Sequence, residues 1–341
     1  MKIFAAISVF AAACAAFATD FNPSAQRLKF LADNFGTELS KANAVGALCV
    51  AVDGKTVLGR DFSPKTKDGK NRKYALGTAS QALMSLLLAA MESDRKIGAE
   101  WNVSKHFSYF GIGGESSATF DDLLCMRAGI SAHSDALIPA DADAADVLQI
   151  SAQIPPAFKP KEAVERSNLS AACAGYAIGY MFDKREKNYK KSFAAASQKY
   201  LFQPLKFEDP RFSSFDKPLF PATAYALSIV DCAKWLECET SPKPPIADAK
   251  TIARRRLSRD ADGKLGQGWT AASQGTANFF VANDAYENCS CLIAVFPREN
   301  AAAAFLVVSK DSAKGTKLCA SALSELVGMI LNPPEKSGTE K

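Results

Sequence analysis

The segment from Ala79 to Met91 is the sequence feature that most restricts the fold of this chain. Its composition is typical of a helix, and its polar residues are Ser80, Gln81 and Ser85. A helix that is apolar on nearly every side is stable in water when other elements surround it. Because the chain has 341 residues, it can build such layers as one large domain or two medium ones.

Strand patterns flank a long helical region. A predicted helix at 21–39 precedes a hairpin, with Asp53-Gly54 as the turn between strands at 44–52 and 56–62. Apolar residues at helical spacing then predict helices at 120–126, 144–152, 170–182, 189–201 and 228–239. Strand-like runs follow at 266–272, 276–282, 289–296 and 302–308, before an amphipathic helix at 317–331.

This order predicts an α+β fold in which early and late segments share one antiparallel sheet flanked by helices. The middle of the chain is expected to form a mostly helical lobe. We expect a discontinuous sheet domain made of 19–77 and 216–332, a lobe made of 78–215, and a mobile polar tail at 333–341.

The N-terminus has the features of a secretory signal peptide over residues 1–18. Lys2 is its charged start, an apolar run follows, and Ala16-Phe17-Ala18 is a small-x-small cleavage site. The apolar run is shorter than the roughly 20 residues that span a bilayer, and no later run is suitable. We therefore expect a secreted or periplasmic protein with no transmembrane segment after cleavage. A weaker match to a lipoprotein site would instead anchor the chain through Cys14.

Charge and cysteine content narrow the range of ligands. The net charge of +5 is spread along the chain without a basic face interleaved with aromatic residues, so nucleic acid binding is not expected. His106 and His133 are the two histidines, and Cys289-x-Cys291 lacks further ligands nearby, so neither a metal nor a cofactor is expected.

Nine cysteines occur, and eight remain without Cys14, an even number that permits disulfides in an oxidising compartment. The candidates are Cys232 with Cys238, and Cys289 or Cys291 with a distant partner. Apolar surroundings favour buried thiols for the cysteines at 49, 173 and 319.

A series of short segments carries a family resemblance. In chain order they are Tyr74-Ala75-Leu76-Gly77-Thr78-Ala79-Ser80-Gln81, Met91 to Ile97, Val103 to Phe107, Thr119 to Ile130, Leu201 to Lys206, Ser228 to Leu236, and Gly266-Gln267-Gly268-Trp269. Together, over roughly residues 40–310, they resemble the class C β-lactamase and D,D-peptidase superfamily of serine hydrolases. The resemblance implies a β-lactamase/transpeptidase-like fold.

The resemblance also implies where a nucleophile would lie. In the family, a helix-start serine attacks a carbonyl, a lysine three residues later and a tyrosine handle its proton, and backbone N–H groups bind the oxyanion. Thr78 and Gln81 stand at the serine and lysine positions. Gln81 cannot act as a general base, a loss of about 10²–10⁴ in rate. Alternatively, Thr78-x-x-Gln81 is a capping box, in which both side chains bind backbone N–H groups.

The other two family motifs are also altered. The tyrosine-x-asparagine motif aligns with Arg166-Ser167-Asn168, and the third motif falls near Ala282-Asn283-Asp284, where nothing basic stands. Arg166 is permanently charged, so it would bind an anion or form an ion pair instead of moving a proton. Asn168 would hydrogen-bond in the cleft or cap the following helix. The candidate binding residues are Arg166, Asn168, Ser80 and Asn283.

We therefore expect an exported relative of these hydrolases that is catalytically inactive and binds a peptidoglycan-like or other small envelope ligand. The alternative is an active hydrolase, esterase or peptidase that uses Thr78 or Ser80. Two further features are expected to be structural. Arg254-Arg255-Arg256 would be a solvated helix turn, or else a contact for an acidic partner or anionic lipid, and Trp269 would belong to the core.

Overall fold

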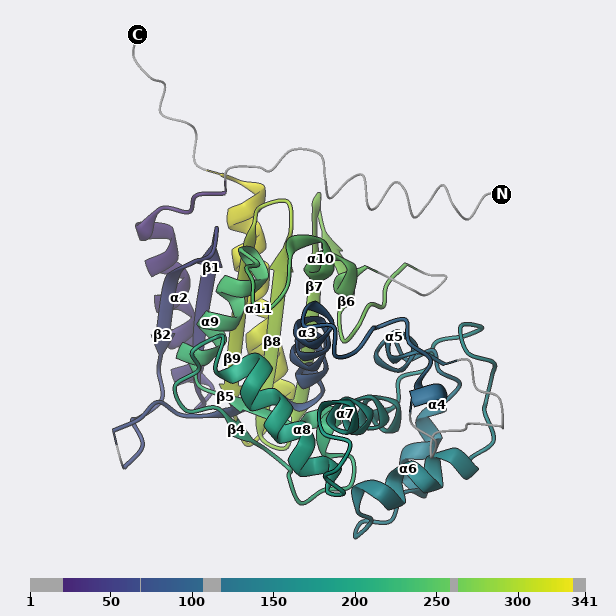
Figure 1. The fold of residues 1–341 in the computed structure, drawn as a ribbon. Helices are drawn as coiled ribbons and strands as arrows, with labels where there is room; N and C mark the ends of the chain where they lie inside the picture. The colour runs from purple at the N-terminus through teal and green to yellow at the C-terminus, as the bar shows by residue number, and fades with distance from the viewer. Residues whose placement is uncertain (1–20, 68, 107–117, 258–262, 334–341) are drawn as a thin grey trace.

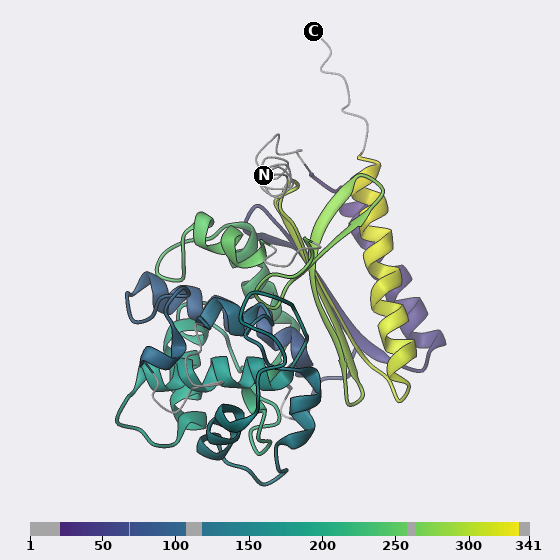
Figure 2. The same cartoon turned by 90° about the vertical axis from the view of Figure 1, so that its right-hand side faces the viewer.

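The computed structural model describes residues 21–67, 69–106, 118–257 and 263–333. A large sheet stands between a pair of helices on one side and a helical lobe on the other (Figure 1 and Figure 2). The predicted signal peptide with Cys14, and residues 334–341 of the predicted tail, lie outside the described residues. No helix within the described ranges is long and apolar enough to cross a membrane.

The large sheet combines strands from both ends of the chain, as predicted. Its antiparallel strand order is β2-β1-β9-β8-β7-β6. The strands are β1 Val45–Val52, β2 Lys55–Asp61, β6 Thr270–Gln274, β7 Ala277–Tyr286, β8 Cys289–Phe296 and β9 Ala301–Val308. Val45 pairs with Val308 and Cys49 with Ala304, so the N-terminal hairpin completes a sheet begun by C-terminal strands. A small second sheet joins β3 (Tyr74–Ala75), β5 (Tyr225–Leu227) and β4 (Arg211–Phe212).

Helices cover both faces of the large sheet. α2 (Ala25–Lys41) and α11 (Ser312–Leu331) pack on one face (Figure 2). On the other side are α3 Ser80–Ser93, α9 Ile229–Thr240 and α10 Ala249–Arg256. The lobe contains α4 Val103–His106, α5 Phe120–Leu124, α6 Ala144–Gln153, α7 Asn168–Phe182 and α8 Tyr189–Ser197. Each sheet face therefore has its own hydrophobic core.

The apolar helix lies where its composition requires. Every residue of α3 from Ser80 to Met91 is buried, between the sheet and the lobe. Trp269, just before β6, is fully buried and packs against Trp235 with ring centroids 6.2 Å apart, which confirms it as a core residue.

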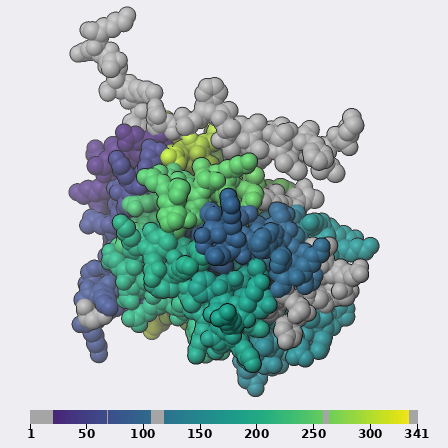
Figure 3. All heavy atoms as spheres, in the orientation of Figure 1, coloured from purple at the N-terminus to yellow at the C-terminus, as the bar shows by residue number. Residues whose placement is uncertain are grey.

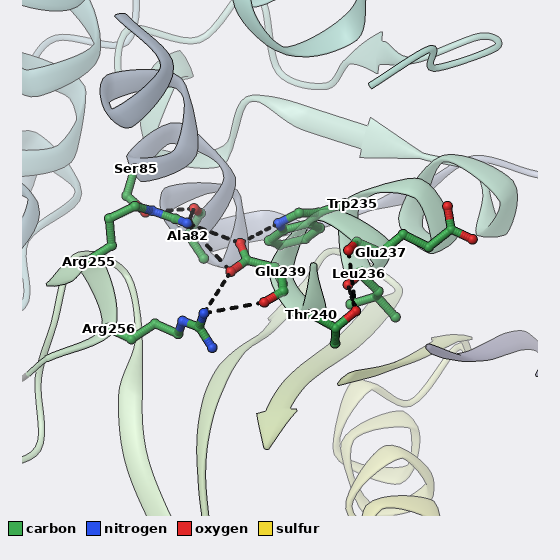
Figure 4. Close-up of polar contacts among 9 residues, drawn as sticks. All are labelled: Ala82, Ser85, Trp235, Leu236, Glu237, Glu239, Thr240, Arg255 and Arg256. Carbon is green, nitrogen blue, oxygen red and sulfur yellow. Dashed lines mark hydrogen bonds and ion pairs between the residues drawn. The ribbon is translucent and has the colours of Figure 1, made fainter. Parts of the chain in front are cut away.

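Two of the three arginines at the end of α10 are buried, so the prediction of a solvated turn is wrong for Arg255 and Arg256, whereas Arg254 is part-exposed and pairs with Glu92. Arg255 is 1% exposed, and its guanidinium donates to Glu239 at 3.1 Å and to Ser85 Oγ at 3.0 Å (Figure 4). Arg256 pairs with Glu239 at 3.7 Å. The last turn of α10 faces the interior because the helix packs against α3, and a charge is retained there when it is paired.

The predicted disulfides are absent from the described part of the chain, where all eight cysteines are buried thiols that form no disulfide. Cys232 and Cys238 are six residues apart on one helix, about 9 Å along its axis, which exceeds disulfide reach. Cys289 and Cys291 lie in β8, in the interior of the sheet. Burial raises the pKa of Cys291 well above its ordinary value, so this thiol stays protonated.

Candidate functional site

The turn that leads into α3 is the centre of the site. Thr78 lies in a 3-10 turn, η1 (Gly77–Ala79), which packs against β7. The Asp284 carboxylate of β7 accepts the Thr78 N–H, with 2.7 Å between N and Oδ2. Gly77 has φ +53°, and a Cβ at this position would lie 2.2 Å from Asp284 Oδ2. Glycine is thus required where this carboxylate approaches the backbone.

The contact with Asp284 replaces the predicted capping box, which is wrong. Neither the turn nor α3 has a side-chain cap from its own segment. A capping box needs a residue with extended backbone before the helix, whereas the turn enters α3 with helical backbone at Ala79. The Thr78 N–H, which has no acceptor within the helix, instead donates to the carboxylate of Asp284, 206 residues later in the sequence.

Within the described residues, no basic side chain hydrogen-bonds to the Thr78 hydroxyl. Among the described residues, no side chain hydrogen-bonds to Thr78 Oγ1, and neither a lysine nor a tyrosine does so. Gln81, one turn into α3, is 7% exposed and neutral. Tyr286 flanks the turn through its Cβ, but its phenol makes no hydrogen bond with Thr78. The thiol of Cys291 lies behind the turn, where it donates to the Leu76 carbonyl at 3.1 Å.

A loop from the strand domain covers the first turn of α3. Gly268 has φ +72°, and a Cβ there would lie 2.5 Å from Ala82 N. The neighbouring side chain of Gln267 is buried and donates to Asp121 Oδ1 of α5 at 2.5 Å. In this Gly-Gln-Gly segment, Gly268 allows the backbone to pass close to α3, and the Gln267 side chain binds the lobe.

Arg166 joins the lobe to the sheet. It is exposed, and its Nη2 donates to Thr270 Oγ1 at 2.7 Å, at the start of the edge strand β6. Its other N–H groups make no hydrogen bond with residues that the structure describes. Arg166 forms no ion pair within those ranges, so the predicted ion pair is not found there, and anion binding by Arg166 stays a prediction.

Asn168 is not the cap of α7, which corrects one alternative for it. Ser167 is the N-cap, and the Asp135 carboxylate accepts both the Asn168 N–H and the Leu169 N–H at 2.9 Å. The half-buried Asn168 side chain makes no hydrogen bond within the described ranges. It remains a candidate for contact with a ligand.

The side chains of two predicted binding residues point away from the Thr78 turn. Ser80 is fully buried, and its Oγ accepts the Tyr225 N–H at 3.0 Å, so it links α3 to β5 in the interior. Asn283 is exposed on β7 and adjoins Asp284 in sequence. Side chains alternate along a strand, so Asn283 points to the α11 side when Asp284 faces the turn. Neither side chain is therefore placed to contact a ligand bound at the Thr78 turn.

The sequence analysis missed Thr270 as a site residue, and near the third motif it selected Asn283 instead of the adjacent Asp284. Strand periodicity could have indicated Asp284, because every second side chain of a strand lies on the same face. Phe280 and Ala282 are buried on the lobe face, and Asp284 follows them on that face. No local signal indicated Thr270, since its contact with Arg166 spans 104 residues.

The fold and this site define a serine-hydrolase-like protein in which a helical lobe and an antiparallel sheet meet at the start of α3. The family model described as Beta-lactamase matches residues 31–325, and the chain belongs to this family. No curated protein matches the sequence.

Solved structures share the fold at low sequence identity. SurE with D-Leu superposes with a TM-score of 0.73 and 16% identity, covering 89% of this chain and 76% of SurE. The octameric penicillin-binding protein homologue from Pyrococcus abyssi gives 0.70 and 14%, covering 88% and 77%. The class C beta lactamase from Rhodobacter sphaeroides gives 0.65 and 15%, covering 88% and 99%. These values establish the shared fold.

Proposed function

We propose that this chain is a non-catalytic member of the beta-lactamase family that binds a small carboxylate-bearing ligand of the cell envelope. The observation that carries the proposal is the 2.7 Å hydrogen bond between the Thr78 N–H and the Asp284 carboxylate. It occupies the backbone donor that acyl transfer would need for its oxyanion.

The carboxylate opposes acyl transfer by electrostatics. An attack by Thr78 Oγ1 would place a negative oxygen near the Thr78 N–H, beside the charge of Asp284. Two like charges about 4 Å apart repel by about 4 kcal/mol at an effective dielectric constant of 20. Such a barrier lowers the rate by about 10³. The absence of a base beside Thr78 adds a further factor of about 10²–10⁴.

The ligand class follows from Arg166 and Asn168. A guanidinium with unused N–H groups recognises carboxylates through paired hydrogen bonds, and the Asn168 amide offers a donor and an acceptor nearby in sequence. The structural neighbour SurE was solved with D-Leu, a small carboxylate. Export, proposed from residues 1–18, would bring the protein to cell-wall peptides, whose free carboxylates fit this site.

The first prediction concerns activity. A fluorophosphonate probe and a fluorescent penicillin should leave the purified chain unlabelled, because no base activates Thr78 and Asp284 occupies its N–H. Intact-protein mass spectrometry after overnight incubation measures this. Labelling that maps to Thr78 or Ser80 and is lost in Thr78→Ala or Ser80→Ala would establish the active-hydrolase alternative.

The second prediction concerns binding. Arg166→Ala should weaken binding of N-acetyl-D-Ala-D-Ala or D-leucine by roughly 10–100-fold, since a charge-assisted hydrogen bond contributes about 1.5–3 kcal/mol. Isothermal titration calorimetry measures the change in Kd. Arg185→Ala is the matched control, an exposed arginine on the lobe. Equal affinities of the wild type and Arg166→Ala would remove Arg166 from the ligand site.

A further inference from the structure

The connection between β2 and β3 carries a concentration of positive charge, and none of its residues belongs to the candidate site around Thr78. We name the described residues 65–67 and 69–73 the basic loop. Its cations are Lys65, Lys67, Lys70, Arg72 and Lys73, and Asp68 is the acid in this stretch of sequence. The loop projects from the body of the protein beside the edge of the sheet (Figure 1 and Figure 3).

The base of the loop adds another cation and one shared acid. Asp209 pairs with Lys73 at 3.0 Å, with Lys70 at 3.6 Å and with Arg211 at 3.6 Å. The hydrogen bond from Lys73 lowers the pKa of Asp209, so this carboxylate is ionised at neutral pH. The five cations of the loop and Arg211 thus outnumber Asp61 and Asp209, the acids described at its base.

The loop is held in place, so the charges have a defined location. At its start, the Asp61 carboxylate accepts hydrogen bonds from Ser63 N–H at 2.9 Å and from the Tyr74 hydroxyl at 3.0 Å. Near its tip, the Thr66 N–H donates to the Lys70 carbonyl at 3.0 Å. These bonds fix both ends of the loop and close its turn, while Lys65, Lys67 and Lys70 stay exposed.

The shape and composition of the loop select the partner. We propose that the basic loop docks the protein on an anionic phospholipid bilayer. A convex tip with several flexible lysines fits a flat, fluid surface of negative headgroups, and clusters of four to eight Lys or Arg residues are typical of such contacts. The loop has no aromatic side chain before Tyr74 on which a nucleic acid base would stack, and Tyr74 is buried. This membrane proposal does not depend on the function proposed for the site around Thr78.

The test measures partitioning onto vesicles by sedimentation. The full-length chain should bind vesicles of 30% phosphatidylglycerol and 70% phosphatidylcholine at low salt and dissociate from them at 0.5 M NaCl. It should not bind vesicles of pure phosphatidylcholine. The variant Lys65→Gln, Lys67→Gln, Lys70→Gln should lose on the order of 100-fold in partition coefficient, about five-fold for each lysine.

A matched control separates location from net charge. Lys184→Gln, Lys187→Gln, Lys191→Gln removes the same charge from exposed positions on the lobe and should keep most of the binding. Circular dichroism confirms that both triple variants are folded. Unchanged partitioning of the loop variant, an equal loss in the lobe variant, or binding to a DNA duplex in place of the vesicles would each overturn the proposal.

Discussion

Replacing Glu239 with glutamine is expected to lower the free energy of unfolding by about 3–5 kcal/mol. The Glu239 side chain is fully buried, and it pairs with Arg255 at 3.1 Å and Arg256 at 3.7 Å. It also accepts the Trp235 Nε1–H at 2.9 Å (Figure 4). The substitution leaves the buried Arg255 guanidinium without the carboxylate that neutralises it and removes the Glu239 charge from Arg256. Urea unfolding followed by circular dichroism measures the loss.

Glu237→Gln is the matched control, since Glu237 lies two residues away on the same helix and is part-exposed. It should cost less than about 1 kcal/mol. Combining Glu239→Gln with Arg255→Met should recover part of the lost stability, because Arg255→Met removes the guanidinium that Glu239→Gln leaves unpaired. A single variant Glu239→Gln as stable as the wild type would show that the cluster contributes little.

The effect of Glu239 should depend on pH. Burial by itself would raise the pKa of Glu239, but Arg255 and Arg256 outweigh it and lower this pKa below the ordinary 4.5. A carboxyl with a lowered folded-state pKa stabilises the protein above the unfolded-state value, and this contribution disappears as the pH falls through the folded-state value. The difference between wild type and Glu239→Gln should therefore be constant at neutral pH and shrink in acid.

Removal of the Asp284 carboxylate is expected to accelerate acylation by on the order of 10³ in a chain with restored catalytic motifs. The background carries Thr78→Ser, Gln81→Lys and Arg166→Tyr, which rebuild the nucleophile and its proton acceptors. Adding Asp284→Ala frees the backbone N–H of residue 78 for the oxyanion. The rate of covalent labelling by a fluorescent penicillin, with and without Asp284→Ala, measures the difference.

The neighbouring residue supplies the control for this experiment. Asn283→Ala changes the other face of β7 and should leave the labelling rate of the restored chain unchanged. Asp284→Ala removes a cap of the turn, a cost of about 1 kcal/mol that a thermal melt would detect. Equal labelling rates with and without Asp284 would show that its carboxylate does not obstruct the site.

Local patterns predicted the fold well because they depend on neighbouring residues. The strand-like residues and the Asp-Gly turn at 44–62 became β1 and β2, and the apolar segment after Thr78 became the buried helix α3. Boundaries moved where the pattern was incomplete. α11 begins at Ser312, five residues before its predicted start, because Asp311 caps it through the Lys314 N–H.

Predictions about polar residues were less accurate, since their partners are distant in sequence. The triple arginine has the composition of a surface turn, yet Arg255 binds Ser85 across 170 residues. Two disulfide candidates, Cys232 and Cys238, lie on one helix that holds them apart. A charged or polar side chain can be exposed or paired, and composition alone does not distinguish these states.

The sequence by itself determined the α+β architecture, the sheet shared by both ends of the chain and the buried helix, for which apolar periodicity suffices. The family resemblance added that the positions of the serine, lysine and tyrosine hold Thr78, Gln81 and Arg166. The tertiary structure alone decided that Asp284 binds the Thr78 N–H, that Arg166 contacts Thr270, and that Glu239 neutralises buried arginines. The physical reason is that a hydrogen bond or ion pair acts over about 3 Å in space, whatever the separation along the chain.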